Sequence, residues 1–190
     1  MSAANPLNPL SIVLTALHLP FVVVGSTASS ARGIPRFTQD IDLVVRICVI
    51  QAEGLATALG KDWYAEPEQI RQAIQNGRSF NIIHMATGWK VDLFPAQTDF
   101  HDSEMRRAIP ESVILDGESV VCPVSTPEDI VLAKLQWYKD GGQVSDRQWR
   151  DIGGVIATNP NLDVDYLRLW AGRLQVTHLL EKALTESTTQ

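Results

Sequence analysis

Two carboxylates stand one residue apart within residues 38–45, TQDIDLVV. Side chains alternate along a strand, so Asp40 and Asp42 would share one face, about 7 Å apart at their Cα atoms. The apolar residues between and after them would face the core: Ile41, Leu43 and Val45. Two like charges this close raise each other's pKa unless a cation compensates them, and carboxylate oxygens suit Mg²⁺ or Mn²⁺. The alternative is a strand end where both acids reach water or pair with Arg36 and Arg46.

A third acid lies in residues 89–95, WKVDLFP. Alternation turns Val91 and Leu93 one way and Asp92 the other. If this strand lies beside the first, three carboxylates meet at one surface of a sheet. That set suffices for a two-metal site, in which paired cations activate a nucleophile and stabilise a leaving group. We therefore predict that Asp40, Asp42 and Asp92 are catalytic and hold the metal.

A glycine–serine turn precedes the acids. In VVVGSTASS, Gly25 and Ser26 follow a buried strand and begin a helix. Glycine lets the backbone approach a phosphate closely, and the N–H groups of a helix start and the Ser26 hydroxyl can bind its oxygens. The order and spacing of this turn relative to the acids favour phosphate binding.

Lys134 lies within an apolar stripe of a predicted helix. Its neighbours three and four positions away are Ile130, Val131, Trp137 and Tyr138. Such a lysine either extends its ammonium group to water or finds an anion.

Other charged residues have ordinary explanations. Asp151 is spaced to form a helical pair with Arg147, worth about 0.3–0.5 kcal/mol. Arg32 and Arg36 flank the loop before the acids, where they either neutralise phosphate or are solvated.

Periodicity and turn signals predict the elements that position these residues. The predicted helices are 8–19, a helix beginning near 26, 51–60, 67–77, 102–109, 125–140, 145–159 and 163–184. The predicted strands are 21–25, 38–47, 79–86, 89–96, 112–117 and 119–125. This pattern indicates an α/β (α+β) fold, a mixed sheet flanked by helices over residues 1–124, with a helical C-terminal part, 125–190, packed on it.

The composition is that of a globular protein, with 45% hydrophobic residues and a net charge of −6. The acidic balance speaks against a large nucleic-acid footprint. No apolar run approaches the roughly 20 residues that span a bilayer, and the N-terminus lacks the pattern of a signal peptide. Cys48 and Cys122 each lie in an apolar, strand-like stretch, which predicts two buried thiols and a cytoplasmic location.

The combined pattern resembles the polymerase-β-type nucleotidyltransferase superfamily. It consists of Gly25-Ser26, then 13 intervening residues (27–39), then DIDLVV, and later VDLF. The resemblance covers roughly residues 20–95. It implies that the Gly-Ser turn binds the triphosphate of a nucleotide, that Asp40 and Asp42 hold the metals, and that Asp92 completes the site and assists the attacking hydroxyl.

A narrower pattern is similar to bacterial AbiEii-like nucleotidyltransferases, which include toxins of toxin–antitoxin pairs. RFTQDIDLVV carries Arg36 and Thr38 ahead of the acids, and TPEDIVLAKLQWY is followed by RQWRDI. This resemblance implies that Arg36 and Thr38 belong to the nucleotide site, that Lys134 contacts nucleotide phosphate and that Asp151 lines the site. The chain departs from the commoner Gly-Gly turn of that group by having Gly-Ser.

The sequence therefore predicts an enzyme that uses Mg²⁺ (or Mn²⁺) to transfer a nucleoside monophosphate from an NTP to a hydroxyl, releasing pyrophosphate. RNA or tRNA 3′ ends, a protein hydroxyl and a small molecule all offer such an acceptor, and the toxin-like resemblance favours RNA and an antitoxin-like partner. The alternative is a nucleotide-binding regulatory module of the same fold without turnover. No membrane partner is expected.

Overall fold

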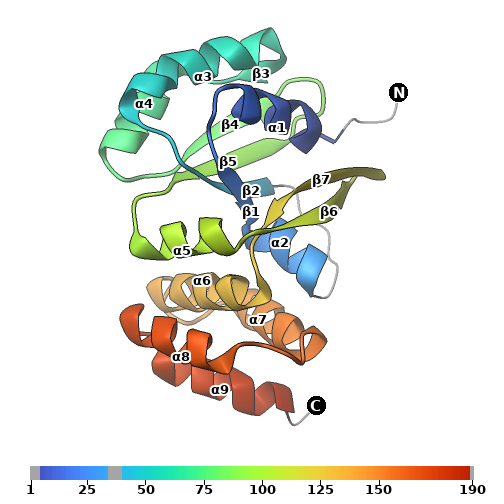
Figure 1. The fold of residues 1–190 in the computed structure, drawn as a ribbon, viewed down its shortest axis with the longest axis vertical. Helices are drawn as coiled ribbons and strands as arrows, with labels where there is room; N and C mark the ends of the chain where they lie inside the picture. The colour runs from blue at the N-terminus through green and yellow to red at the C-terminus, as the bar shows by residue number, and fades with distance from the viewer. Residues whose placement is uncertain (1–4, 34–39, 189–190) are drawn as a thin grey trace.

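A computed structural model describes residues 5–33 and 40–188 of the chain (Figure 1). Its helices are α1 (Leu7–Ala16), α2 (Gly25–Arg32), α3 (Ala52–Leu59), α4 (Pro67–Gln75), α5 (Asp99–Arg107), α6 (Pro127–Asp140), α7 (Asp146–Thr158), α8 (Val164–Arg173) and α9 (Thr177–Thr188). Its strands are β1 (Phe21–Val24), β2 (Asp40–Val45), β3 (Trp63–Tyr64), β4 (Phe80–His84), β5 (Lys90–Pro95), β6 (Ile109–Leu115) and β7 (Glu118–Val124). Two 3₁₀ segments, η1 (Val49–Gln51) and η2 (Gly60–Asp62), flank α3.

The strands of the described chain form one mixed seven-stranded sheet in the order β3-β4-β5-β2-β1-β7-β6. β1 is antiparallel to β2, whereas β2 and β5 run parallel at the centre of the sheet. β4 and β5 form the predicted hairpin, with Gly88 at a φ of 73° in its turn. The predicted mixed α+β fold is confirmed.

One face of the central strands is buried under helices from the first half of the chain. Ile41 and Leu43 of β2 and Leu93 of β5 are completely buried there. They share a core cluster with apolar residues of α1, α3 and α4, namely Leu10, Leu14, Leu55, Ile70 and Ile74. These three helices lie together on one side of the sheet in Figure 1. The alternation predicted for residues 38–45 and 89–95 is thus confirmed on its apolar side.

From residue 127 onward the described chain is helical, and α6 to α9 lie on the opposite side of the sheet from α1, α3 and α4 (Figure 1). α6 begins with the start signals expected of it: Thr126 accepts a hydrogen bond from the Asp129 N–H, and Pro127 occupies the first turn. α6 packs against α7 and α8, and α2 packs against both α6 and α7. That residues 125–190 form a separate subdomain stays a prediction.

A buried polar network joins α5 to the C-terminal helices. Arg107 contacts Asp129 at 3.2 Å and Glu128 at 2.9 Å, and its guanidinium lies 3.8 Å from the centre of the Tyr166 ring. The Tyr166 hydroxyl donates to Asp129 at 2.5 Å and also lies 3.0 Å from the Ser103 hydroxyl. Each buried charge therefore has partners, as burial requires.

Two predictions about local structure are wrong. Residues 163–184 do not form one helix, because Gln175 has a φ of 58° and separates α8 from α9. A residue in the left-handed region cannot continue a right-handed helix. Cys48 is exposed rather than buried, because β2 ends at Val45 and Cys48 lies before η1, whereas Cys122 is buried in β7 as predicted.

The helices of the described ranges, 5–33 and 40–188, include none with the length and apolar character of a membrane span.

Replacing Gln175 by glycine is expected to stabilise the protein by about 0.5–1 kcal/mol, because glycine adopts a positive φ without the Cβ clash. Gln69, exposed inside α4, provides the control, and Gln69→Gly should cost about 1 kcal/mol. Urea unfolding measures both changes. A loss of stability in Gln175→Gly would contradict the assigned backbone conformation.

Candidate functional site

The three predicted carboxylates project from neighbouring strands on the face opposite the apolar core. Asp42 of β2 and Asp92 of β5 are direct Cα partners, and the partner of Asp40 is Lys90. Asp40 is exposed, whereas Asp42 and Asp92 are half-buried. The prediction that residues 89–95 lie beside residues 38–45 is therefore confirmed, and the structure brings the three acids to one surface.

Lys90 lies among these acids and was not anticipated. Its Nζ is 2.8 Å from Asp92 Oδ2 and 3.7 Å from Asp40 Oδ1. The hydrogen bond to Asp92 is the main reason that the pKa of Lys90 is raised. Arg46, a predicted alternative partner of the acids, instead pairs with Asp102 at 2.6 Å. The signal for Lys90 was in the sequence, since a residue two positions before Asp92 shares its strand face.

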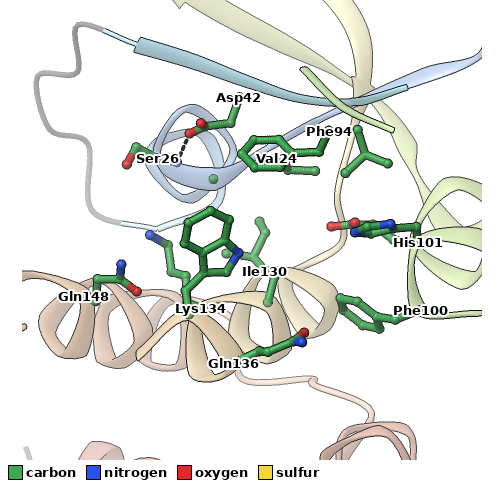
Figure 2. A pocket seen from close by; sticks show the side chains of 15 residues that line it. Val24, Ser26, Asp42, Phe94, Phe100, His101, Ile130, Lys134, Gln136 and Gln148 are labelled. Carbon is green, nitrogen blue, oxygen red and sulfur yellow. Dashed lines mark hydrogen bonds between the residues drawn. The ribbon is translucent and has the colours of Figure 1, made fainter. Parts of the chain in front are cut away.

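The Gly25-Ser26 turn packs directly against Asp42. α2 begins at Gly25, which has a φ of 61°, and the Ser26 N–H donates to Asp42 Oδ2 at 3.4 Å (Figure 2). A Cβ on Gly25 would lie 2.1 Å from that oxygen. Both the backbone conformation and the close approach thus require glycine at this position.

Burial raises the pKa of the Asp42 carboxyl. The hydrogen bond from the Ser26 N–H lowers it, and repulsion from Asp92 and Asp40 raises it further. Lys134 lowers this pKa from across the pocket. An additional cation beside Asp42 would relieve the repulsion.

The donor chemistry at this surface fits a divalent cation. Hard carboxylate oxygens are the ligands that Mg²⁺ and Mn²⁺ prefer. A cation beside Asp42 would offset the repulsion from Asp92 and Asp40, which adds to the effect of burial in raising the pKa of Asp42. Within residues 5–33 and 40–188, no group of three or more His, Cys, Asp or Glu side chains is arranged so that it could hold a metal ion. The ammonium of Lys90 stands between Asp40 and Asp92 instead.

Lys134 and Asp151 form an ion pair between α6 and α7. Lys134 Nζ lies 2.9 Å from Asp151 Oδ2, and Lys134 is only 7% exposed. Asp151 therefore pairs with a lysine of another helix, whereas the sequence suggested a pair with Arg147 of its own helix. Figure 2 shows Lys134 extending from α6 toward the side of the pocket where Ser26 and Asp42 lie.

A pocket of about 240 Å³ separates the carboxylate face from α6. Its lining is mainly apolar and aromatic, with a few polar groups among them: Val24, Gly25, Ser26, Asp42, Val44, Phe94, Phe100, His101, Glu104, Ile130, Ala133, Lys134, Gln136, Trp137 and Gln148 (Figure 2). Gln148 Oε1 is buried and has no hydrogen-bond partner among the described residues. Sequence reasoning found four of these residues, Gly25, Ser26, Asp42 and Lys134, and missed the others because they come from six separate elements.

The far end of the pocket is closed by Glu104 and His101 of α5. Glu104 is almost completely buried and accepts a hydrogen bond from the Ser125 hydroxyl at 2.6 Å. Burial raises the pKa of Glu104 to about 8, and burial lowers the pKa of His101. At neutral pH this end of the pocket is therefore largely uncharged.

The remaining predicted residues either have partners away from the carboxylate face or lie outside the residues that the structure describes. Arg32 pairs with Glu111 of β6 at 2.8 Å, which gives it a structural partner away from the acids. Arg36 and Thr38 lie outside the described residues, so their predicted roles stay predictions.

The contact between Gly25 and Asp42 can be isolated by a matched pair of substitutions. Gly25→Ala should destabilise the protein by about 1–3 kcal/mol more than Gly88→Ala, because both glycines have a positive φ but only Gly25 faces a close neighbour. Urea unfolding of both variants gives the difference. Equal losses of stability would show that Asp42 does not pack on the turn.

Glu104 is expected to make stability depend on pH. The pKa of Glu104 is raised in the folded state, so the protonated side chain favours folding. This contribution to the free energy of unfolding is complete below the unfolded pKa of about 4.5 and is lost as the pH rises through about 8. The free energy of unfolding should fall by ~1.5 kcal/mol between about pH 6.5 and about pH 8. Glu104→Gln should flatten that decline, and an unchanged slope would refute the assignment.

The sequence matches no protein-family model and no curated protein. Solved structures that match the fold include two of the antibiotic-resistance factor ANT(2″)-Ia. Its solution structure gives a TM-score of 0.50 at 13% identity and covers 93% of this chain and 92% of that chain. Its crystal structure in complex with adenylyl-2″-tobramycin gives a TM-score of 0.52 at 16% identity, and the match covers 89% of this chain and 94% of that chain.

A third match is the crystal structure of an antigenic nucleotidyltransferase-like protein from Paracoccidioides brasiliensis. Its TM-score is 0.51 at 18% identity, and the match covers 93% of this chain and 88% of that chain. At these identities the likeness concerns the fold. The chain has a nucleotidyltransferase-like fold, with its acidic surface and pocket on the same side of the sheet.

Proposed function

We propose that this protein transfers a nucleoside monophosphate from an NTP to an acceptor hydroxyl, with a divalent cation bound at the acidic face. The observation that carries the proposal is the contact of Asp42 with the Gly25-Ser26 turn, directly opposite Asp92 in the sheet. A phosphate site and a cation site are thereby adjacent. The nucleotidyltransferase-like fold supports the same reaction class.

Asp40, Asp42 and Asp92 would hold Mg²⁺ or Mn²⁺. When bound, the cation supplies neutralisation of the charge that develops on the phosphates and on the departing pyrophosphate. The Ser26 hydroxyl and the N–H groups at the start of α2 bind triphosphate oxygens, and Gly25 admits them closely. Lys134, positioned by Asp151, lies across the pocket as a further phosphate partner.

The reaction exchanges one P–O bond for another. The acceptor oxygen attacks the α-phosphorus, the bond to the β-phosphate oxygen breaks, and pyrophosphate leaves with its electron pair. A carboxylate oxygen of Asp92 accepts the proton of the acceptor hydroxyl. Most of the rate enhancement then comes from positioning and charge stabilisation.

The pocket between the sheet and α6 is the proposed place for the acceptor. Its volume of about 240 Å³ and its apolar lining suit a small molecule or a single nucleoside. The ANT(2″)-Ia complex, whose ligand is adenylyl-2″-tobramycin, supports a small-molecule acceptor by analogy of fold. The AbiEii-like sequence features support an RNA 3′ end and a toxin role, and with them an antitoxin-like partner.

One observation favours a nucleotide-binding module without turnover as the second candidate. Lys90 pairs with Asp92, the residue proposed to accept the proton, at 2.8 Å. The ammonium group of Lys90 thereby occupies a carboxylate oxygen of Asp92 that the proposed proton transfer would need.

Asp42→Asn is expected to lower transfer of an α-labelled phosphate from NTP by at least about 100-fold, because it removes one cation ligand and one negative charge while leaving the side-chain shape. The assay combines each labelled NTP, Mg²⁺ or Mn²⁺, and RNA, protein or small hydroxyl acceptors in parallel.

Asp62→Asn, which changes an exposed acid of η2, provides the control and should retain full transfer. Undiminished transfer by Asp42→Asn would disprove the proposed site. Metal-dependent NTP binding without transfer to any acceptor class would favour the binding module.

A further inference from the structure

We propose that Lys90 takes the place of one of two catalytic cations, so that this acidic face binds a single divalent ion. The inference rests on the proposed function, because it concerns the same three carboxylates. The inference adds that the ammonium group of Lys90 is itself a fixed part of the site. Three carboxylates on one sheet face would otherwise supply enough ligands for two metal ions.

The position of Lys90 is set by the sheet rather than by a loose surface contact. β5 lies between β2 and β4, and the Cα of Lys90 has partners on both sides, Asp40 and Ile83. Strand alternation places its side chain on the face that carries Asp92. Its Nζ then reaches Asp92 at 2.8 Å and Asp40 at 3.7 Å.

These two contacts join carboxylates from different strands. A divalent ion shared by Asp40 and Asp92 would have to occupy the same space between them. The ammonium hydrogens of Lys90 already satisfy an oxygen of Asp92, and repulsion between two cations opposes a metal ion beside them. Lys90 therefore competes directly with a cation at the Asp40–Asp92 side of the face.

Asp42 is the acid that Lys90 leaves available. Its described hydrogen bond comes from the Ser26 N–H, on the side away from Lys90, and it faces the pocket. The single cation would thus bind at Asp42, next to the turn proposed to hold the triphosphate.

The test counts Mn²⁺ ions bound per chain, by electron paramagnetic resonance of free Mn²⁺ during titration of the whole protein. The unmodified protein is expected to bind one ion. Lys90→Met should bind two, because the second position becomes available, and Lys90→Arg should still bind one. Lys61→Met, an exposed lysine of η2, is the matched control and should also bind one.

Thermal melting establishes that each variant is folded, and Lys90→Gln replaces Lys90→Met if the latter does not melt cooperatively. Two ions in the unmodified protein, or one ion in both Lys90→Met and Lys90→Gln, would overturn the inference and leave the proposed function standing. If the unmodified protein binds no Mn²⁺, or if Asp42→Asn leaves Mn²⁺ binding unchanged, both this inference and the proposed function are overturned. The two failures are therefore distinguishable without an activity assay.

Discussion

The parallel pairing of β2 with β5 is the constraint on which the rest of the site depends. It places Asp42 opposite Asp92 and, through the same alternation, buries Ile41 and Leu93 on the other face. A shift of one residue would move the acids into the core and the apolar side chains to the surface. The hydrophobic energy of the core therefore maintains the register that brings the carboxylates together, although it is contributed by residues that never contact a substrate.

The C-terminal helices convert this acidic face into a pocket. α6 passes over it with Lys134, and α5 closes the far end with Glu104. The contacts of Arg107 with Asp129 and Glu128 tie α5 to α6. The network has no role in the proposed chemistry, yet it sets the spacing between the sheet and the helix and hence the shape of the pocket. α5 and α6 thus each carry a charged residue of this network, Arg107 and Asp129, and a residue that lines the pocket, Glu104 and Lys134.

Sequence patterns could predict the elements and the three acids because both follow from local periodicity. Alternation identified Asp40, Asp42 and Asp92, and the turn signals identified Gly25. The lining of the pocket could not be predicted in this way, since Phe94, Glu104 and Gln148 come from distant segments whose packing no local pattern encodes. The break at Gln175 was missed because glutamine is a good helix former and tertiary packing overrode its preference.

Three carboxylates on one sheet face oppose folding, because they repel one another in a partly buried setting. Burial is the main cause of the raised pKa of Asp42, and repulsion from Asp92 and Asp40 adds to it. Lys90 offsets part of this repulsion through its contacts with Asp92 and Asp40. In the proposed single-cation site, the ammonium group that offsets this repulsion without metal would also limit the number of metal ions at the face. Stability and metal binding would then compete for the same oxygens, with Lys90 as the residue that sets the balance between them.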